Sequence, residues 1–185
     1  RRGFQFISAN LETSTLAEEI KILSAAPLLY QPSTSWRYSV SMDVLARIIE
    51  IVRDDSLQNI LEEKIFTPLN MKDTGFNVPK NNHKKVMTSY EFDIIKNKLS
   101  ELIYDPQKIG NYGYPLNISS YARGGHGLFS TLKDYAIFAK MLHHGTSDNG
   151  HQILKEDTLQ LISTNFLDSK YLPIEISTIG VVKDK

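Results

Sequence analysis

Apolar residues recur at helical spacing in several stretches of the chain, and polar residues beside them predict where each helix begins. Thr15 and Glu18 form a T-x-x-E capping box, so a helix is expected near 15–25, ending before Pro27. A second helix is expected over 41–52, where one face carries an apolar stripe of Leu45, Ile48, Ile49 and Val52. Ser56 is placed to cap a third helix, whose core-facing residues before Pro68 are Leu57, Ile60, Leu61 and Ile65. The second and third helices should pack as a pair.

The second half of the chain has a less regular pattern. Residues 77–123 predict irregular structure with short strands, including a strand or helix around 89–95. Thr131 and Asp134 form a T-x-x-D box, both side chains being expected to bind free backbone amides, and open a helix that ends at Gly145. A short helix near 156–163 follows, and β-rich residues in 174–182 predict one or two strands. The expected fold class is therefore α+β, mostly helical, with short strands in 77–130 and 174–182.

Composition excludes several classes of function. The 185 residues are 41% hydrophobic, which is enough to bury a core. The 21 Lys and Arg residues balance 21 Asp and Glu residues, so we expect no nucleic-acid partner. The absence of cysteine excludes disulfides and thiolate chemistry without deciding between a bacterial periplasmic or secreted location and a cytoplasmic one. No apolar run approaches the roughly 20 residues that cross a bilayer, so no membrane span is expected.

The histidines and glycines do not have the spacing of a metal or phosphate site. Neither H-x-x-x-H nor H-E-x-x-H spacing occurs, and the adjacent His143 and His144 should point to different helix faces. The run from Gly124 to Gly127 lacks the G-x-x-x-x-G-K-[ST] context of a phosphate loop. Its glycines are better interpreted as permitting positive φ and close backbone approach near a cleft. No metal and no cofactor are expected.

Two blocks of sequence carry a family resemblance. The first is WRYSVSMDVL at 36–45, followed by PLNMKDTGF at 68–76, and the second is GGHGLFST at 124–131 with Asp134 after it. In this order, over roughly residues 16–165, they resemble the serine β-lactamase-like family: class C β-lactamases, penicillin-binding proteins, D-amino-acid peptidases and family VIII carboxylesterases. The resemblance implies the helical domain of the β-lactamase/transpeptidase-like fold. Residues 1–185 would then form a single partial domain covering the active site of a larger hydrolase.

The resemblance also implies which residues carry chemistry. Tyr38 takes the place of the family's catalytic tyrosine, which relays the proton of a serine nucleophile. Val40 stands where class C β-lactamases usually have an asparagine that holds the substrate amide, a departure that moves the interpretation toward an esterase or peptidase. Ser39 is the middle residue of the motif and is also interpreted as a helix-start residue. The candidates for the substrate pocket are Trp36, Ser39, Val40, Gly124, Gly125 and His126.

The other two motifs of the family have no counterpart in these residues. The one formal S-x-x-K match, Ser130 to Lys133, follows the tyrosine instead of preceding it, and we interpret it as a helix cap. No Lys/His/Trp-x-Gly motif is found near the end of the chain. We therefore expect a segment of a serine hydrolase that forms an acyl-enzyme with a small-molecule or peptide substrate (an ester, amide, peptide or β-lactam) and is inactive alone. The alternative is a non-catalytic binding or interaction module, and self-association through exposed apolar surface is expected if the segment was excised.

Overall fold

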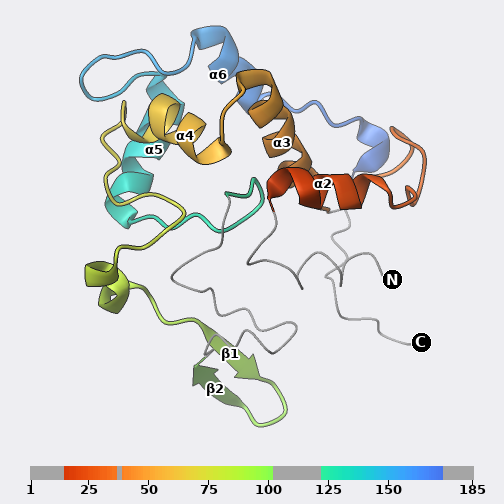
Figure 1. Ribbon diagram of the computed structural model, residues 1–185, viewed down its shortest axis with the longest axis horizontal. Coiled ribbons are helices and arrows are strands. Elements are labelled where there is room, and N and C mark those ends of the chain that lie inside the picture. The colour runs from red at the N-terminus through yellow and green to blue at the C-terminus, as the bar shows by residue number, and fades with distance from the viewer. Residues whose placement is uncertain (1–14, 37–38, 102–121, 173–185) are drawn as a thin grey trace.

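The computed structural model describes residues 15–36, 39–101 and 122–172, and most of the ordered elements there are helices (Figure 1). In chain order the elements are α2 (Leu16–Ser24), α3 (Ser41–Arg53), α4 (Leu57–Leu61), the π-helix η1 (Glu62–Phe66), the 3₁₀ helix η2 (Lys80–Lys85), β1 (Tyr90–Asp93), β2 (Lys98–Glu101), α5 (Leu132–His144), α6 (Glu156–Ser163) and the 3₁₀ turn η3 (Ser169–Tyr171). The mostly helical α+β expectation is confirmed. The strands expected in 174–182 lie outside the described residues.

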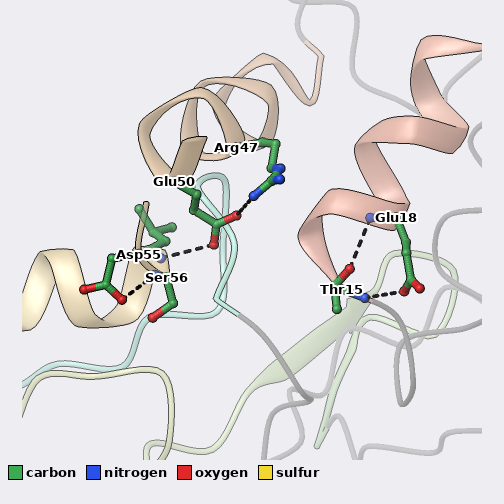
Figure 2. A network of polar contacts seen from close by, with 7 residues as sticks. Thr15, Glu18, Arg47, Glu50, Asp55 and Ser56 are labelled. Carbon is green, nitrogen blue, oxygen red and sulfur yellow. Dashed lines mark hydrogen bonds and ion pairs between the residues drawn. The ribbon is translucent and has the colours of Figure 1, made fainter. Parts of the chain in front are cut away.

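The helix starts follow the predicted capping residues. The Thr15 hydroxyl accepts a hydrogen bond from the Glu18 amide at 3.2 Å, and the Glu18 carboxylate accepts one from the Thr15 amide at 2.8 Å, so both halves of the capping box form (Figure 2). The Ser56 hydroxyl accepts a hydrogen bond from the Asn59 amide at 3.2 Å and begins α4. These bonds satisfy amide groups that a helix start otherwise leaves without a partner.

The corner between α3 and α4 is closed by Glu50. One oxygen of its carboxylate accepts a hydrogen bond from the Leu57 amide at 3.1 Å, and the other forms an ion pair with Arg47, also at 3.1 Å (Figure 2). Asp54 ends α3 in the left-handed conformation with a φ of 51°, so the chain turns sharply there. The two helices pack as the predicted pair, because α4 begins against a side chain of α3.

Two clusters of buried side chains form the core. The first joins α2, α3 and α4 through Leu16, Ala46, Leu57, Phe76 and Ala122. The second joins η1 to α5 through Phe66, Leu69, Met71 and Met141. Leu57 and Ile60 are buried and Leu61 and Ile65 half-buried, as the pattern after Ser56 predicts.

Helix α3 buries a different face from the one its apolar stripe marks. Leu45, Ile48 and Val52 are 45%, 51% and 76% exposed, whereas the inner side of the helix carries Asp43 and Ala46, at 5% and 2%. The small side chain of Ala46 lets neighbouring backbone approach closely, so contact there follows side-chain size more than hydrophobicity.

The described part of 77–123 contains the expected short strands. Strands β1 and β2 pair antiparallel, with Phe92 opposite Leu99, and form a hairpin that extends away from the helices (Figure 1). Asp93 stabilises its turn by accepting hydrogen bonds from the amides of Ile95 and Lys96, both at 3.0 Å. The strand alternative for 89–95 is therefore confirmed over Tyr90–Asp93.

The helices of the second half begin and end close to the predicted residues. Gly145 ends α5 with a φ of 75°, and its amide donates to the Met141 carbonyl at 2.7 Å. Helix α6 occupies the range expected for it. Near the end of the described chain, the Tyr171 hydroxyl donates to the Ser33 carbonyl and connects η3 to the loop after α2. Within the described ranges, no helix is long and apolar enough to cross a membrane.

Candidate functional site

The residues around the tyrosine motif lie just before and at the start of α3. Tyr38 itself lies outside the described residues. Trp36 is 37% exposed. Val40 is the N-cap residue of α3 and makes no side-chain capping bond, because valine has no polar group. Ser39 precedes the cap, and its hydroxyl lies 2.5 Å from that of Ser41, so it belongs to the helix start without capping the helix.

The second set of predicted pocket residues lies directly against the first turn of α3. We call residues 122–127 the glycine turn. A Cβ atom at Gly124 would overlap the Met42 carbonyl oxygen and lie 2.9 Å from the Ala46 Cβ, so this position needs glycine. Gly127 has a φ of 95°, in the region that favours glycine. Both uses predicted for these glycines, close backbone approach and positive φ, are confirmed.

One buried carboxylate joins the glycine turn to α3. The Gly125 amide donates a hydrogen bond to Asp43 Oδ1 at 3.0 Å, across 82 residues of sequence. Asp43 is 5% exposed and is the third residue of its helix. The motif that begins at Trp36 and the glycine turn are therefore brought together through this contact.

An ion pair holds the glycine turn from a second side. Arg123 Nη2 lies 2.6 Å from Glu19 Oε1, and the two side chains are 10% and 8% exposed. His126 follows in the turn, with its Nε2 3.5 Å from Arg123 Nη1. The pKa of His126 is lowered from its usual value, first by burial and then by the positive charge of Arg123, against smaller opposing effects of Asp43 and Glu19. This direction favours the neutral imidazole, which can accept as well as donate a hydrogen bond.

A second buried carboxylate, that of Asp134, holds another turn of the chain. Asp134, 3% exposed and also the third residue of its helix, accepts hydrogen bonds from the Asp73 amide and the Thr74 hydroxyl, both at 2.8 Å. Gly75 and Phe129 are linked by two backbone hydrogen bonds of 3.0 and 2.8 Å. The turn at 73–76, the segment after the glycine turn and α5 are thus one hydrogen-bonded unit.

The formal S-x-x-K match acts as a helix cap. The Thr131 hydroxyl accepts a hydrogen bond from the Asp134 amide at 3.2 Å, as predicted, and Ser130 Oγ lies 2.8 Å from Thr74 Oγ1. The expectation for the other half of the box needs correction. The Asp134 carboxylate does bind a free backbone amide, but that amide belongs to Asp73, 61 residues away.

The remaining candidate clusters do not add to the site. His143 and His144 contact each other edge to face, with ring centroids 4.5 Å apart. In the described part of the chain, no three histidine, aspartate or glutamate side chains are grouped to hold a metal ion. A surface hollow lies at the α3–α4 corner, lined by Arg47, Glu50, Ile51, Asp54, Asp55 and Ser56. It is at the far end of α3 from the tyrosine motif, and its Arg47 and Glu50 are already paired with each other.

Sequence reasoning missed the residues that hold the site together. Glu19 and Asp43 look like surface residues, because helical periodicity places charged side chains outside the apolar stripe, and Arg123 lies in a stretch predicted to be irregular. One signal was present: each of the two matched blocks has an aspartate at the third position of its helix, Asp43 and Asp134. Both prove to be buried carboxylates that bind a distant loop.

Comparison with known proteins places this geometry in a family. The family model described as Beta-lactamase matches residues 5–175. Protein Rv1367c of Mycobacterium tuberculosis is 30% identical over 145 residues, which cover 78% of this chain and 34% of that protein. The lovastatin esterase of Penicillium rubens is 29% identical over 148 residues, covering 75% of this chain and 33% of the esterase. The chain thus spans about a third of the length of these relatives.

A solved structure shows the same fold. EstCE1, a hydrolase with promiscuous acyltransferase activity, superposes with a TM-score of 0.63 at 23% identity, over 82% of this chain and 41% of that one. The sequence match, the shared fold and the contact between the two motif blocks all support the same family. The chain belongs to the β-lactamase family, whose β-lactamase-like hydrolases include esterases, acyltransferases and peptidases.

Proposed function

We propose that the intact protein is a serine hydrolase that forms an acyl-enzyme with an ester, amide or peptide substrate. In this proposal residues 1–185 supply the proton-transfer residue Tyr38 and one wall of the pocket, formed by the start of α3 and the glycine turn. The observation that carries the proposal is the contact of Asp43 with Gly125, which joins the two sequence blocks by which the family resemblance was identified.

The role of Tyr38 follows from the chemistry of a phenol. A tyrosine hydroxyl has a pKa of about 10 in water, so it becomes a useful base at neutral pH only beside a cation that stabilises the phenolate. In the family the lysine of the S-x-x-K motif normally helps to do this. Tyr38 would take the proton of the serine during acylation and return it to the leaving group.

The wall of the pocket favours esters and other acyl groups over β-lactams. Val40 is half-buried at the start of α3 and has no side-chain group to hold a substrate amide. His126 offers a neutral imidazole, and Trp36 a partly exposed aromatic face. An apolar edge with few hydrogen-bonding groups suits an acyl chain that needs burial more than polar recognition. The naming of two relatives as esterases is consistent with this preference.

The test uses the intact protein, expressed with the coding sequence on both sides of residues 1–185. It should hydrolyse p-nitrophenyl esters, turn over a chromogenic cephalosporin much more slowly, and gain the mass of one acyl group with a fluorophosphonate probe. The chain of residues 1–185 alone should do none of these. Turnover by that chain would overturn the proposed division of the site, and failure of the intact protein to react with any of the three would overturn the hydrolase proposal.

A Tyr38→Phe variant tests the residue assigned to proton transfer. Loss of a positioned acid–base group typically costs about 10²–10⁴-fold in rate, so acylation should slow by at least that lower figure. Tyr30→Phe provides the matched control, because Tyr30 lies in the loop before the motif and is 36% exposed. Equal acylation rates in the Tyr38→Phe variant and the unmodified protein would remove Tyr38 from the mechanism.

A non-catalytic binding module is the second candidate, and Val40 is the observation that favours it. Such a module would keep the hydrogen bonds of Asp43 and Asp134 and would bind the same class of ligand without cleaving it. An in-frame S-x-x-K motif upstream and a Lys/His/Trp-x-Gly motif downstream support the enzyme. Their absence from the coding sequence, together with binding but no turnover of an ester, would support the module.

A further inference from the structure

The buried carboxylate of Asp43 needs an explanation beyond packing. A carboxylate at 5% exposure is costly to bury unless hydrogen bonds compensate for its lost hydration. An apolar side chain at this position would be buried without that cost. The carboxylate is better explained by what it holds, which is the Gly125 amide of a turn 82 residues away.

Asp43 is also connected by backbone to the tyrosine motif. Its amide donates to the Val40 carbonyl at 3.0 Å, in the first turn of α3, and Val40 is two residues after Tyr38. One residue thus links the motif, through its main chain, to the glycine turn, through its side chain. Movement of the glycine turn away from the start of α3 would break the bond between Gly125 and Asp43.

Two further contacts hold the glycine turn beside Asp43. Gly124 lies against the Met42 carbonyl, and Arg123 is paired with Glu19 of α2. His126 extends from this turn beside Arg123. The hydrogen bond from the Gly125 amide to the Asp43 carboxylate joins the turn directly to α3.

We propose that Asp43 is a positioning residue of the hydrolase site, whose carboxylate holds the glycine turn, which carries His126, in place against the start of α3. The inference rests on the proposed function. Asp43 takes no part in proton transfer and acts through the place of the turn. Because rates of positioned reactions fall steeply when reacting groups are displaced by about 1 Å, a shift of the turn should change the rate of acylation more than substrate affinity.

The experiment compares three variants of the intact protein with p-nitrophenyl ester as substrate and active sites titrated by fluorophosphonate. Asp43→Ala removes the acceptor, and kcat per titrated site should fall about 10- to 100-fold with a much smaller change in KM. Asp43→Asn keeps an amide oxygen in the place of Oδ1, so kcat should recover to within about threefold of the unmodified protein. Gly124→Ala displaces the turn from the other side and should also lower kcat.

A control separates positioning from loss of stability. Met141→Ala empties a site in the second core cluster, so Tm should fall while kcat per titrated site stays unchanged. Unchanged kcat in Asp43→Ala, an equal fall in Met141→Ala, or no recovery in Asp43→Asn would each overturn the positioning role. If Asp43→Ala does not fold, Gly124→Ala decides, and unmodified kcat in that variant would also overturn the role. Failure of the unmodified protein to acylate at all would instead refute the hydrolase proposal.

Discussion

Substitution of Asp134 by alanine should destabilise the protein more than any substitution of an exposed charged residue on the same helix. Its carboxylate accepts hydrogen bonds from the Asp73 amide and the Thr74 hydroxyl, both at 2.8 Å, and only 3% of the residue is exposed. Alanine would leave the Asp73 amide without this acceptor. The turn at 73–76 would lose its connection to α5.

The magnitude follows from the two bonds. A hydrogen bond to a charged acceptor contributes about 1.5–3 kcal/mol to stability. The Thr74 hydroxyl keeps a second partner, because Ser130 Oγ lies 2.8 Å from it, so its share of the loss should be at the low end. Removal of a buried charge offsets part of the loss. The free energy of unfolding should therefore fall by about 2–4 kcal/mol for Asp134→Ala, and by less for Asp134→Asn, which keeps one acceptor oxygen.

Urea unfolding followed by circular dichroism at 222 nm measures this difference. Lys140→Ala is the matched control, since Lys140 lies on the same helix, its Nζ is 2.5 Å from Asp148 Oδ1, and both side chains are about 60% exposed. An exposed ion pair of this kind contributes about 0–1 kcal/mol. A loss below about 1 kcal/mol for Asp134→Ala, or equal losses for the two variants, would refute the claim that Asp134 holds the turn.

Three further predictions concern the glycine turn and the first helix. Gly124→Ala should lower the free energy of unfolding by at least about 2 kcal/mol more than Gly125→Ala does. A Cβ at Gly124 would overlap backbone of α3, whereas one at Gly125 would lie 3.4 Å from the nearest side-chain atom. The midpoints of urea unfolding measure the difference, and equal midpoints would contradict the prediction. The lowered pKa of His126 means that protons bind the unfolded chain more tightly. Its contribution to stability should be fully present above pH 6.5 and be lost as the pH falls through the lowered pKa of the folded state. His126→Gln should therefore flatten the acid side of a stability–pH curve, and an unchanged curve would mean that folding does not lower the pKa of the ring. Thr15→Ala should lower the free energy of unfolding by about 1 kcal/mol through loss of the N-cap, and a change below about 0.3 kcal/mol in urea unfolding would mean that the capping box of α2 is not formed in solution.

Local chemistry explains what could be predicted from the sequence. Capping residues such as Thr15 and Ser56 act on amides within three residues of themselves, so their effect can be recognised without knowledge of the rest of the fold. Gly145 ends α5 because it adopts positive φ without strain, which is again a property of one residue. The family blocks were recognised in the same way, as residues at fixed short spacings.

The buried side of α3 could not be predicted by such reasoning. The apolar stripe of Leu45, Ile48, Ile49 and Val52 has the spacing of a core-facing surface, yet Ile49 is half-buried and the other three side chains are exposed in the described structure. The core contact is made instead by Ala46 and Asp43, because the backbone of the glycine turn approaches the helix there. Periodicity shows which residues share a face but not which face another segment will cover.

The sequence by itself determined the helices, their caps and the family, because each of these depends on residues close together in the chain. Only the tertiary structure decided the partners of Asp43, Asp134 and Glu19, which lie 82, 61 and 104 residues from the groups they bind. A carboxylate has the same preference for a donor wherever the donor comes from, so nothing in its local sequence specifies the partner. Folding decides it by bringing an amide or a guanidinium within about 3 Å of a carboxylate that is itself buried.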